Sequence, residues 1–251
     1  MNKNNSRNDH IVITGGLSGI GLETVKIINK NNPNLKIIIT SRESDNVSRN
    51  LKKIFPNSNN IQLMKLDLSN DFSVDEFLQQ IKQNCEKIQA LILNAGFIET
   101  SPCLMTTHNS IEKHLHVNYI NNIKIIQFIV RRYMLKQRNG SVVNVSSSAA
   151  KHANSGRMAY AASKGAMSIA IKVMSRELGQ NNITFNSISP GLTETKLMRN
   201  STDEENIKDY LKNIDNRKIA MPSEIAYLIN FLISEKNTHI TGQDISIDGG
   251  I

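Results

Sequence analysis

The chain has 251 residues, long enough for one α/β domain with a large buried core that needs no disulfide or metal. Its 30 Lys and Arg exceed its 22 Asp and Glu and give a formal net charge of +8. These basic residues are spread along the chain, which indicates a solvated surface and excludes a nucleic-acid-binding arm. Cys85 and Cys103 lack the spacing of a metal site or a disulfide framework, no apolar segment could span a membrane, and the polar N-terminus has no signal-peptide core. We therefore expect a cytoplasmic protein that binds no metal, nucleic acid or membrane.

Short β-branched segments alternate with longer amphipathic segments along the whole chain, a pattern typical of βαβ units around a parallel sheet. The sequence predicts strands at 10–14, 35–40, 61–66, 90–93, 141–146, 183–187 and 244–248. It predicts helices at 19–31, 47–55, 73–85, 110–138, 158–179, 202–214 and 222–234. No linker or repeat divides the chain. Residues 10–251 should therefore form a single-domain, Rossmann-like, doubly wound α/β fold of seven parallel strands with helices on both faces, after a polar extension at 1–9.

A cluster of glycines follows the first predicted strand and opens the first helix, in the segment Thr14-Gly15-Gly16-Leu17-Ser18-Gly19-Ile20-Gly21. Glycines here let the backbone turn tightly and approach a diphosphate, and the helix N-terminus offers free N–H groups to its charge. Such a cluster can also be a tight turn without a ligand. Its Gly-x-x-x-Gly-x-Gly spacing differs from the commoner Gly-x-Gly-x-x-Gly of dinucleotide-binding proteins and indicates a particular family.

Four motifs occur in one order: Thr14-Gly15-x-x-x-Gly19-x-Gly21, Asn94-Ala95-Gly96, Tyr160-x-x-x-Lys164 and Pro190-Gly191. Their order and spacing resemble the short-chain dehydrogenases/reductases over residues 10 to 250. The ending, Ile240-Thr241-Gly242-Gln243 to Asp248-Gly249-Gly250, resembles the bacterial 3-oxoacyl-acyl-carrier-protein reductases. The resemblance implies hydride transfer between a nicotinamide cofactor and a ketone or secondary alcohol.

The end of the second strand is predicted to select the cofactor. Family members that use NAD usually carry an acid there, whereas this chain has Ser41-Arg42, a hydroxyl and a guanidinium that could hold the 2′-phosphate of NADPH. Alternatively, Arg42 only solvates a loop. The resemblance places Asp67 and the neighbouring Leu68 at the adenine. The complete expected NADP-binding set is Thr14, Gly15, Ser18, Gly19, Ile20, Gly21, Ser41, Arg42, Asp67, Leu68, Asn94, Ala95, Gly96, Tyr160, Lys164, Pro190, Gly191, Thr193 and Thr195.

Tyr160 and Lys164 are four residues apart in a predicted helix, so both side chains emerge on one face. The resemblance makes Tyr160 the general acid, with a pKa lowered by Lys164, which also contacts the nicotinamide ribose. Ser147 is the expected polarising hydroxyl, with Ser146 and Ser148 as alternatives.

One further catalytic residue is expected in the fourth long helix. Asn118 matches the asparagine that holds a water of the proton relay, although an ordinary helix-face amide is the alternative. His114 and His116 flank it at a spacing that points them apart, so surface or packing roles are expected for both.

The segment after the sixth strand, Pro190-Gly191-Leu192-Thr193-Glu194-Thr195, matches the family stretch that closes over the nicotinamide. Backbone groups near Leu192 and Thr193 should hold the carboxamide, and the Thr195 hydroxyl should reach the carboxamide or the diphosphate. A lid that excludes water is expected at about 193–218.

The substrate is less determined. Arg138 matches one basic position of the carrier-protein reductases, but the second position is Asn181, which is uncharged, and Arg157 could bind an anionic substrate or be a solvated loop residue. The leading hypothesis is an NADPH-dependent ketone reductase acting on a small molecule. The candidate substrates include biosynthetic intermediates, among them carrier-linked and anionic ones. A 3-oxoacyl-acyl-carrier-protein reductase and a catalytically inactive nucleotide-sensing or scaffold protein are the alternatives.

The predicted helices at 110–138 and 158–179 resemble those that pair in family dimers. The last predicted strand resembles the one that completes a tetramer, so a homodimer or homotetramer is expected.

Overall fold

The computed structural model describes residues 9–42, 47–56, 58–152 and 154–251. These residues contain one sheet of seven parallel strands in the order β3-β2-β1-β4-β5-β6-β7, which confirms the predicted fold class. The strands are β1 (Asp9–Ile13), β2 (Lys36–Ser41), β3 (Ile61–Lys65), β4 (Lys87–Leu93), β5 (Gly140–Val145), β6 (Ile183–Pro190) and β7 (Asp244–Ile247).

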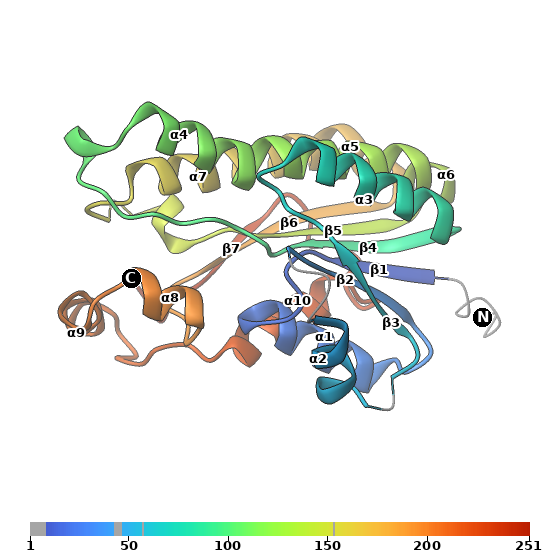
Figure 1. Ribbon diagram of the computed structural model, residues 1–251, viewed down its shortest axis with the longest axis horizontal. Helices are drawn as coiled ribbons and strands as arrows, with labels where there is room; N and C mark the ends of the chain where they lie inside the picture. The colour runs from blue at the N-terminus through green and yellow to red at the C-terminus, as the bar shows by residue number, and fades with distance from the viewer. Residues whose placement is uncertain (1–8, 43–46, 57, 153) are drawn as a thin grey trace.

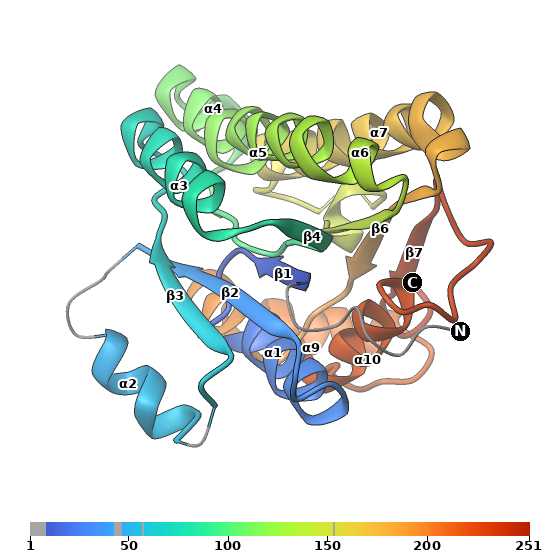
Figure 2. The same cartoon turned by 90° about the vertical axis from the view of Figure 1, so that its right-hand side faces the viewer.

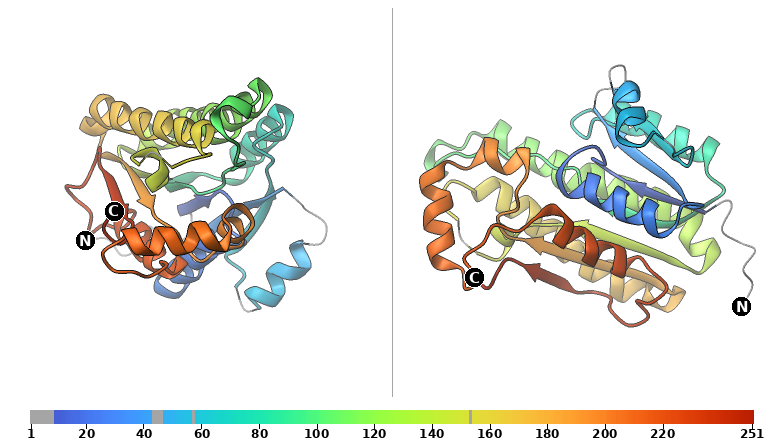
Figure 3. Two further views of the ribbon diagram at one scale, coloured as in Figure 1. Left: turned by 90° about the vertical axis from the view of Figure 1, so that its left-hand side faces the viewer. Right: turned by 90° about the horizontal axis from the view of Figure 1, so that it is seen from below.

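Helices cover both faces of the sheet (Figure 1). One face carries α3 (Asp71–Asn84), the long helical segment α4 (His108–Leu115) to α6 (Leu135–Gln137), and α7 (Met158–Leu178). The other face carries α1 (Gly19–Asn31) and α10 (Pro222–Leu232), which pack on each other, with α2 (Val47–Ile54) outside them (Figure 2). Two more helices, α8 (Lys196–Ser201) and α9 (Glu204–Asn213), lie beyond one edge of the sheet (Figure 3).

Strand alternation divides the core into two layers. In β1, Ile11 and Ile13 pack with α1 and α10, whereas Val12 between them packs with the helices of the opposite face. All three side chains are buried. Because both faces of the strands are covered, the strands are nearly continuously apolar, which is why the β-branched segments could be recognised in the sequence.

The long helical segment is not uniform. It was predicted as one helix at 110–138, and it does run without a break in the chain, but it contains two π-helical turns, His116–Ile120 and Val130–Met134. A π turn inserts one residue into the helical repeat and so rotates the side chains that follow it. Asn118 lies inside the first of these turns.

Several predicted boundaries were shifted. β1 begins at Asp9, one residue before the predicted strand at 10–14, and residues 1–8 of the predicted extension lie outside the described residues. β6 continues to Pro190 because Ser187 to Pro190 pair with β7. No helix in the described part of the chain has the length and apolarity needed to cross a bilayer.

The strand order reverses between β1 and β4. β2 and β3 lie to one side of β1, and β5, β6 and β7 lie beyond β4. In open α/β sheets this reversal leaves a crevice at the carboxyl ends of the strands, where ligands bind. The loops after β1, β4, β5 and β6 all begin at this edge, on the side where α8 and α9 lie in Figure 1.

Candidate active site

The glycine loop after β1 is fixed to the end of β4 by two side chains. The Thr14 hydroxyl accepts hydrogen bonds from the backbone N–H groups of Asn94 and Ala95, both at 3.0 Å. The Asn94 amide donates in return to the carbonyl oxygens of Thr14 and Gly15, also at 3.0 Å. These four bonds determine the path of the loop where the strand order reverses.

The same loop forms a space that side chains would fill. Gly15 and Gly19 have φ angles of 69° and 51°, which favour glycine, and a Cβ at Gly21 would collide with the Gly15 carbonyl oxygen. Helix α1 begins at Gly19, and the exposed Ser18 before it makes no side-chain capping bond. The first N–H groups of a helix have no acceptor within the helix and bind anions well. The loop therefore fits the diphosphate of a dinucleotide.

The residues expected at the adenosine end gather beside this loop. Ser41 is the last residue of β2, and Arg42 follows it on the surface. Burial acts to raise the pKa of the Asp67 carboxyl, but hydrogen bonds from Ser69 and the charges of Arg42 and Lys65 outweigh it, so this pKa is lowered. Arg42 and Asp67 are thus close enough to interact.

Leu68 contributes to this region only through its backbone. Its side chain is buried in the core, and its carbonyl oxygen accepts a hydrogen bond from Asn121 at 3.0 Å. The cofactor contact expected at this position could therefore involve main-chain atoms only.

One strand end and one helix bring Ser147, Tyr160 and Lys164 together. Ser147 follows β5, and its hydroxyl lies close enough to that of Tyr160, in the first turn of α7, to act on its pKa. One turn later, Lys164 is 5% exposed, and its Nζ lies 6.0 Å from the centre of the Tyr160 ring. The three candidate catalytic residues thus lie side by side at the carboxyl edge of the sheet.

The charges around Tyr160 differ from the expected arrangement. Burial raises the pKa of Tyr160, and the groups that oppose this rise are the Ser147 hydroxyl and the positive charge of Arg157. Lys164, which was expected to lower this pKa, instead donates from Nζ to the carbonyl oxygen of Val145 at 2.8 Å. Burial lowers the pKa of Lys164 to about 8.

The neighbouring serines have other partners. The Ser146 hydroxyl is buried and lies 2.9 Å from that of Ser168 on α7. The Ser148 hydroxyl, also buried, lies close enough to that of Tyr210 to act on its pKa. Of the three adjacent serines, Ser147 is the one that meets Tyr160.

Asn118 is buried, and its side chain is hydrogen-bonded throughout. Its Oδ1 accepts from the backbone N–H of Phe97, and its Nδ2 donates to the Phe97 carbonyl oxygen and to the Ser163 hydroxyl. A Cβ at Gly96 would lie 3.3 Å from both Asn118 Oδ1 and Lys164 Nζ, so these atoms flank the same glycine. Asn118 thus supports the loop after β4 through its side chain.

The two flanking histidines have structural partners. His114 is buried, receives a hydrogen bond from the Glu99 N–H at 3.1 Å and packs on the Phe97 ring. His116 lies 2.8 Å from an Asp71 carboxylate oxygen. Neither histidine points to a shared site, as their spacing predicted.

The segment after β6 is held by contacts with three parts of the chain. Pro190 ends β6, and the Gly191 N–H donates to the Ile247 carbonyl oxygen. Thr193 is buried, pairs with Ala220 and donates from its hydroxyl to the Gly191 carbonyl oxygen. Thr195 caps α8 by accepting from the Met198 N–H, and its methyl group would touch a Cβ at Gly19. The beginning of the expected lid therefore lies against the glycine loop.

Tyr210, on α9, was not among the predicted residues. Its hydroxyl accepts from the Leu192 N–H at 3.1 Å and donates to the Asp248 carbonyl oxygen at 3.3 Å. A Cβ at Gly191 would collide with this hydroxyl. The tyrosine lies in α9, outside every motif recognised in the sequence, so no local pattern marked it.

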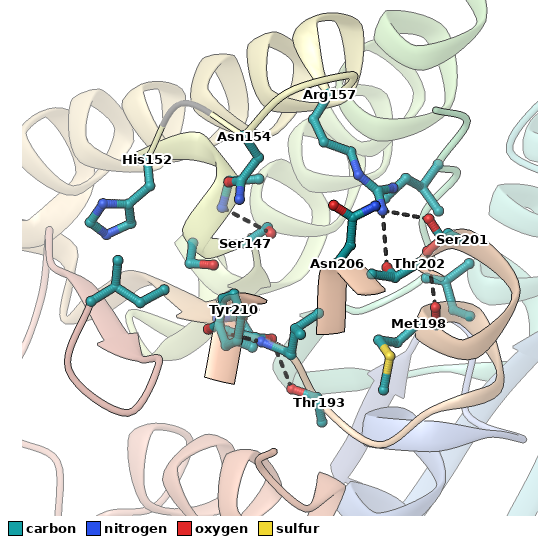
Figure 4. Close-up of a pocket in the computed structure, with 18 of the residues that line it drawn as sticks. Ser147, His152, Asn154, Arg157, Thr193, Met198, Ser201, Thr202, Asn206 and Tyr210 are labelled. Carbon is teal, nitrogen blue, oxygen red and sulfur yellow. Dashed lines mark hydrogen bonds between the residues drawn. The ribbon is translucent and has the colours of Figure 1, made fainter. Parts of the chain in front are cut away.

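A pocket of about 470 Å³ lies between these residues and the lid helices (Figure 4). Ser147 and Arg157 line one side, while Met198 and Tyr210 line the side of α8 and α9. The pocket thus joins the candidate catalytic hydroxyl to the segment predicted as a lid.

Comparison with known proteins agrees with this geometry. A family model described as Enoyl-(Acyl carrier protein) reductase matches residues 15–251, nearly the whole chain. The chain belongs to the short-chain dehydrogenase/reductase family. The resemblance inferred from the motifs is therefore confirmed, and this short-chain dehydrogenase/reductase is an oxidoreductase acting on CH–OH or C=O groups. The alternative of a catalytically inactive scaffold protein is therefore no longer considered.

Three known proteins are similar to this chain in sequence or in fold. The 3-oxoacyl-(acyl-carrier-protein) reductase of Thermotoga maritima is 30% identical to this reductase over 240 residues, which cover 96% of each chain. A 4-hydroxyisoleucine dehydrogenase solved with NADH and succinate is 28% identical, with a TM-score of 0.85 and coverage of 96% of this chain and 98% of that one. The structure of ElxO with NADP bound is 24% identical and shares the fold, with a TM-score of 0.87. The match covers 96% of this chain and 98% of that one.

Proposed function

We propose that this short-chain dehydrogenase/reductase is an NADPH-dependent enzyme that reduces a small ketone, or oxidises the matching secondary alcohol. The observation that carries the proposal is the convergence of Ser147, Tyr160 and Lys164 at the carboxyl edge of the sheet, where Ser147 lines the pocket. A carbonyl placed between two hydroxyls can accept a hydrogen bond from one and a proton from the other.

In this mechanism the chain binds the carbonyl and supplies the proton. Ser147 donates a hydrogen bond to the substrate oxygen and stabilises the charge that develops on it. Tyr160 gives its hydroxyl proton to the same oxygen. Arg157, by opposing the rise in the Tyr160 pKa, makes that proton easier to transfer. When bound, the reduced nicotinamide supplies the hydride to the carbonyl carbon. Oxidation of the alcohol reverses both transfers.

Other residues would hold the cofactor. The N–H groups at the start of α1, with Ser18 beside them, fit the diphosphate. Lys164 would hydrogen-bond the nicotinamide ribose, and the backbone near Leu192 and Thr193 would bind the carboxamide. Since Leu192 N–H is bonded to Tyr210, this amide could bind the carboxamide only after that bond breaks. Asn118 would hold the water of the proton relay through its backbone, because its side chain is occupied.

The preference for NADPH rests on the end of β2. Arg42 lies on the surface next to Ser41 and acts on Asp67, where it could meet a 2′-phosphate. The 4-hydroxyisoleucine dehydrogenase was solved with NADH, so the family accommodates both cofactors. The charge at this position is our reason for choosing NADPH.

A 3-oxoacyl-acyl-carrier-protein reductase is the second candidate, favoured by the Thermotoga maritima relative. Arg138, the retained basic residue, precedes β5, so it lies at the edge of the sheet opposite Ser147. The six residues of β5 separate the two by about 20 Å, at about 3.3 Å per residue. The Arg138 guanidinium donates to the carbonyl oxygen of Gln180, next to the uncharged Asn181. This separation and the missing second charge favour a small substrate.

The test is a screen of ketones and acyl thioesters followed by nicotinamide absorbance. We expect reduction of small ketones with NADPH, and Arg138→Glu should leave this rate unchanged. A strong preference for carrier-linked substrate over its thioester mimic, lost in Arg138→Glu, would instead establish the carrier-protein reductase. No turnover with any ketone, thioester or alcohol would refute the proposal.

A further inference from the structure

Arg157 connects the candidate catalytic residues to the lid. It precedes α7, three residues before Tyr160, and its guanidinium reaches across the pocket (Figure 4). Nη2 donates to the Ser201 carbonyl oxygen at 2.6 Å and to the Thr202 hydroxyl at 3.0 Å. Both acceptors lie at the end of α8 and the turn that follows it. The guanidinium is therefore fixed in direction by the lid.

The other end of the guanidinium has no partner. Nη1 is buried and makes no hydrogen bond within the described residues. A buried donor without an acceptor costs about 1–3 kcal/mol, and more when it is charged. Such a group in a native protein needs an explanation, and in a pocket a bound ligand is the simplest.

No described carboxylate neutralises Arg157. The two aspartates that line the same pocket have other partners: Asp203 accepts from Asn206, at the start of α9, and Asp209 pairs with Lys212 at 2.9 Å. Burial lowers the pKa of the Arg157 guanidinium, a further sign that its charge lacks compensation. The pocket thus presents the positive charge of Arg157 on the side that Ser147 lines.

We propose that Arg157 binds a carboxylate of the substrate through Nη1 while the substrate carbonyl lies at Ser147 and Tyr160. The substrate is then a small oxo acid, or the corresponding hydroxy acid, which rests on the function proposed above. One guanidinium with one free end matches one carboxylate in charge and shape, whereas a phosphate would need further donors. The pocket volume of about 470 Å³ suits a molecule of this size.

The lid takes part in this binding. Because Nη1 is buried, a ligand can reach it only after the bonds from Nη2 to Ser201 and Thr202 have broken and the lid has opened. When the lid closes, Nη2 returns to these acceptors and Nη1 keeps the carboxylate. Substrate binding and lid closure therefore stabilise each other.

The first experiment compares pyruvate, acetoacetate and levulinate with their methyl esters, using NADPH. The parent should prefer at least one acid over its ester. Arg157→Gln should raise KM for that acid by about 10- to 100-fold, the range expected for a lost charged hydrogen bond, and change KM for the ester by less than about threefold. A fall in kcat shared by acid and ester would report the separate effect of the Arg157 charge on Tyr160. An equal rise in KM for acid and ester would overturn the proposal.

The second experiment needs no turnover. Calorimetric titration of the parent with succinate and with its uncharged diamide should show binding of succinate alone. Arg157→Gln should weaken it at least tenfold, and Arg157→Lys should restore part of it. Lys172→Gln, which removes an exposed charge on α7 outside the pocket lining, should bind succinate within about threefold of the parent. If succinate does not bind the parent, or binds Arg157→Gln equally, or if inorganic phosphate binds more tightly than succinate, the proposal is wrong.

The two experiments separate the inference from the proposed function. Succinate binding that depends on Arg157, without reduction of any ketone, would support the carboxylate site and refute the reductase. Reduction of ketones without any dependence of KM or succinate binding on Arg157 would support the reductase and refute the carboxylate site.

Discussion

Lys164 Nζ donates a 2.8 Å hydrogen bond to the carbonyl oxygen of Val145, two residues before Ser147. This bond ties α7 to the end of β5 and thereby sets the distance between Tyr160 and Ser147. The ammonium is buried without a carboxylate partner among the described residues, so its charged form is destabilised and its pKa falls to about 8. Burial of the Lys164 charge thus lowers the stability of the fold, while the bond to Val145 holds this side chain in the site.

The first prediction concerns the pH dependence of stability. The Lys164 pKa is 10.5 in the unfolded chain and about 8 in the folded one. Between these values the unfolded chain binds more protons, so the free energy of unfolding should rise with pH. Lys164→Met should flatten this rise between about pH 8 and about pH 10, measured by denaturant unfolding. Lys172→Met, at an exposed position of the same helix, should keep the parent slope. If the free energy of unfolding of Lys164→Met rose with pH as steeply as that of the parent, the lowered pKa of Lys164 would be contradicted.

The second prediction concerns the proton donor. Tyr160→Phe keeps the ring and removes the hydroxyl that meets Ser147, so turnover should fall at least about 100-fold while NADPH affinity stays nearly unchanged. Single-turnover rates and cofactor titration measure the two effects. Tyr227→Phe, at an exposed position on α10, is the control and should react like the parent. Full activity of Tyr160→Phe would remove this residue from the role of acid.

The third prediction concerns the choice of cofactor. Ser41→Asp places a carboxylate at the end of β2, where it should repel a 2′-phosphate and accept a hydrogen bond from a 2′-hydroxyl. The ratio of kcat/KM for NADPH to that for NADH should fall at least about tenfold. Asn34→Asp, at an exposed position just before the other end of β2, offers a comparison for charge alone. A parent that binds NADH more tightly than NADPH would show the premise to be wrong.

The fourth prediction concerns the glycine loop. Asn94→Ala removes the two donated hydrogen bonds that hold Thr14 and Gly15, at a cost of about 1–3 kcal/mol in the free energy of unfolding. Because the loop would lose its fixed path, cofactor affinity should fall more than the rate at saturating cofactor. Asn94→Asp retains a side chain of similar shape without the donor and should behave like Asn94→Ala. An affinity equal to that of the parent would show that the loop holds its shape without Asn94.

The fifth prediction concerns assembly. On α7, Ile169 and Val173 are 60% and 47% exposed, one turn apart on the same face. An exposed apolar pair on a long helix, beside small residues such as Ala162 and Ala166, is typical of a helix that packs on a partner. We expect a dimer or tetramer by light scattering at micromolar concentration, and Ile169→Glu with Val173→Glu should produce a smaller species. Lys172→Glu, on the same helix, is the matched control. A monomeric parent would refute the assembly.

The sequence by itself determined the fold class, since the alternation of β-branched and amphipathic segments requires strands covered on both faces. It also determined which residues meet at the strand ends. The four-residue spacing of Tyr160 and Lys164 fixes their common face in any helix, because local geometry follows from the periodicity of the chain. The choice of Ser147 from three adjacent serines came from the resemblance to the family.

The tertiary structure decided the contacts between distant segments. Tyr210 and Ser201 meet Leu192 and Arg157 only because α8 and α9 fold back over the carboxyl edge of the sheet. The same is true of Lys164 and Val145, whose bond corrected the expected electrostatics of Tyr160. Hydrogen bonds, burial and pKa shifts depend on which groups the whole chain brings within a few ångströms of one another, and sequence spacing does not specify those distances.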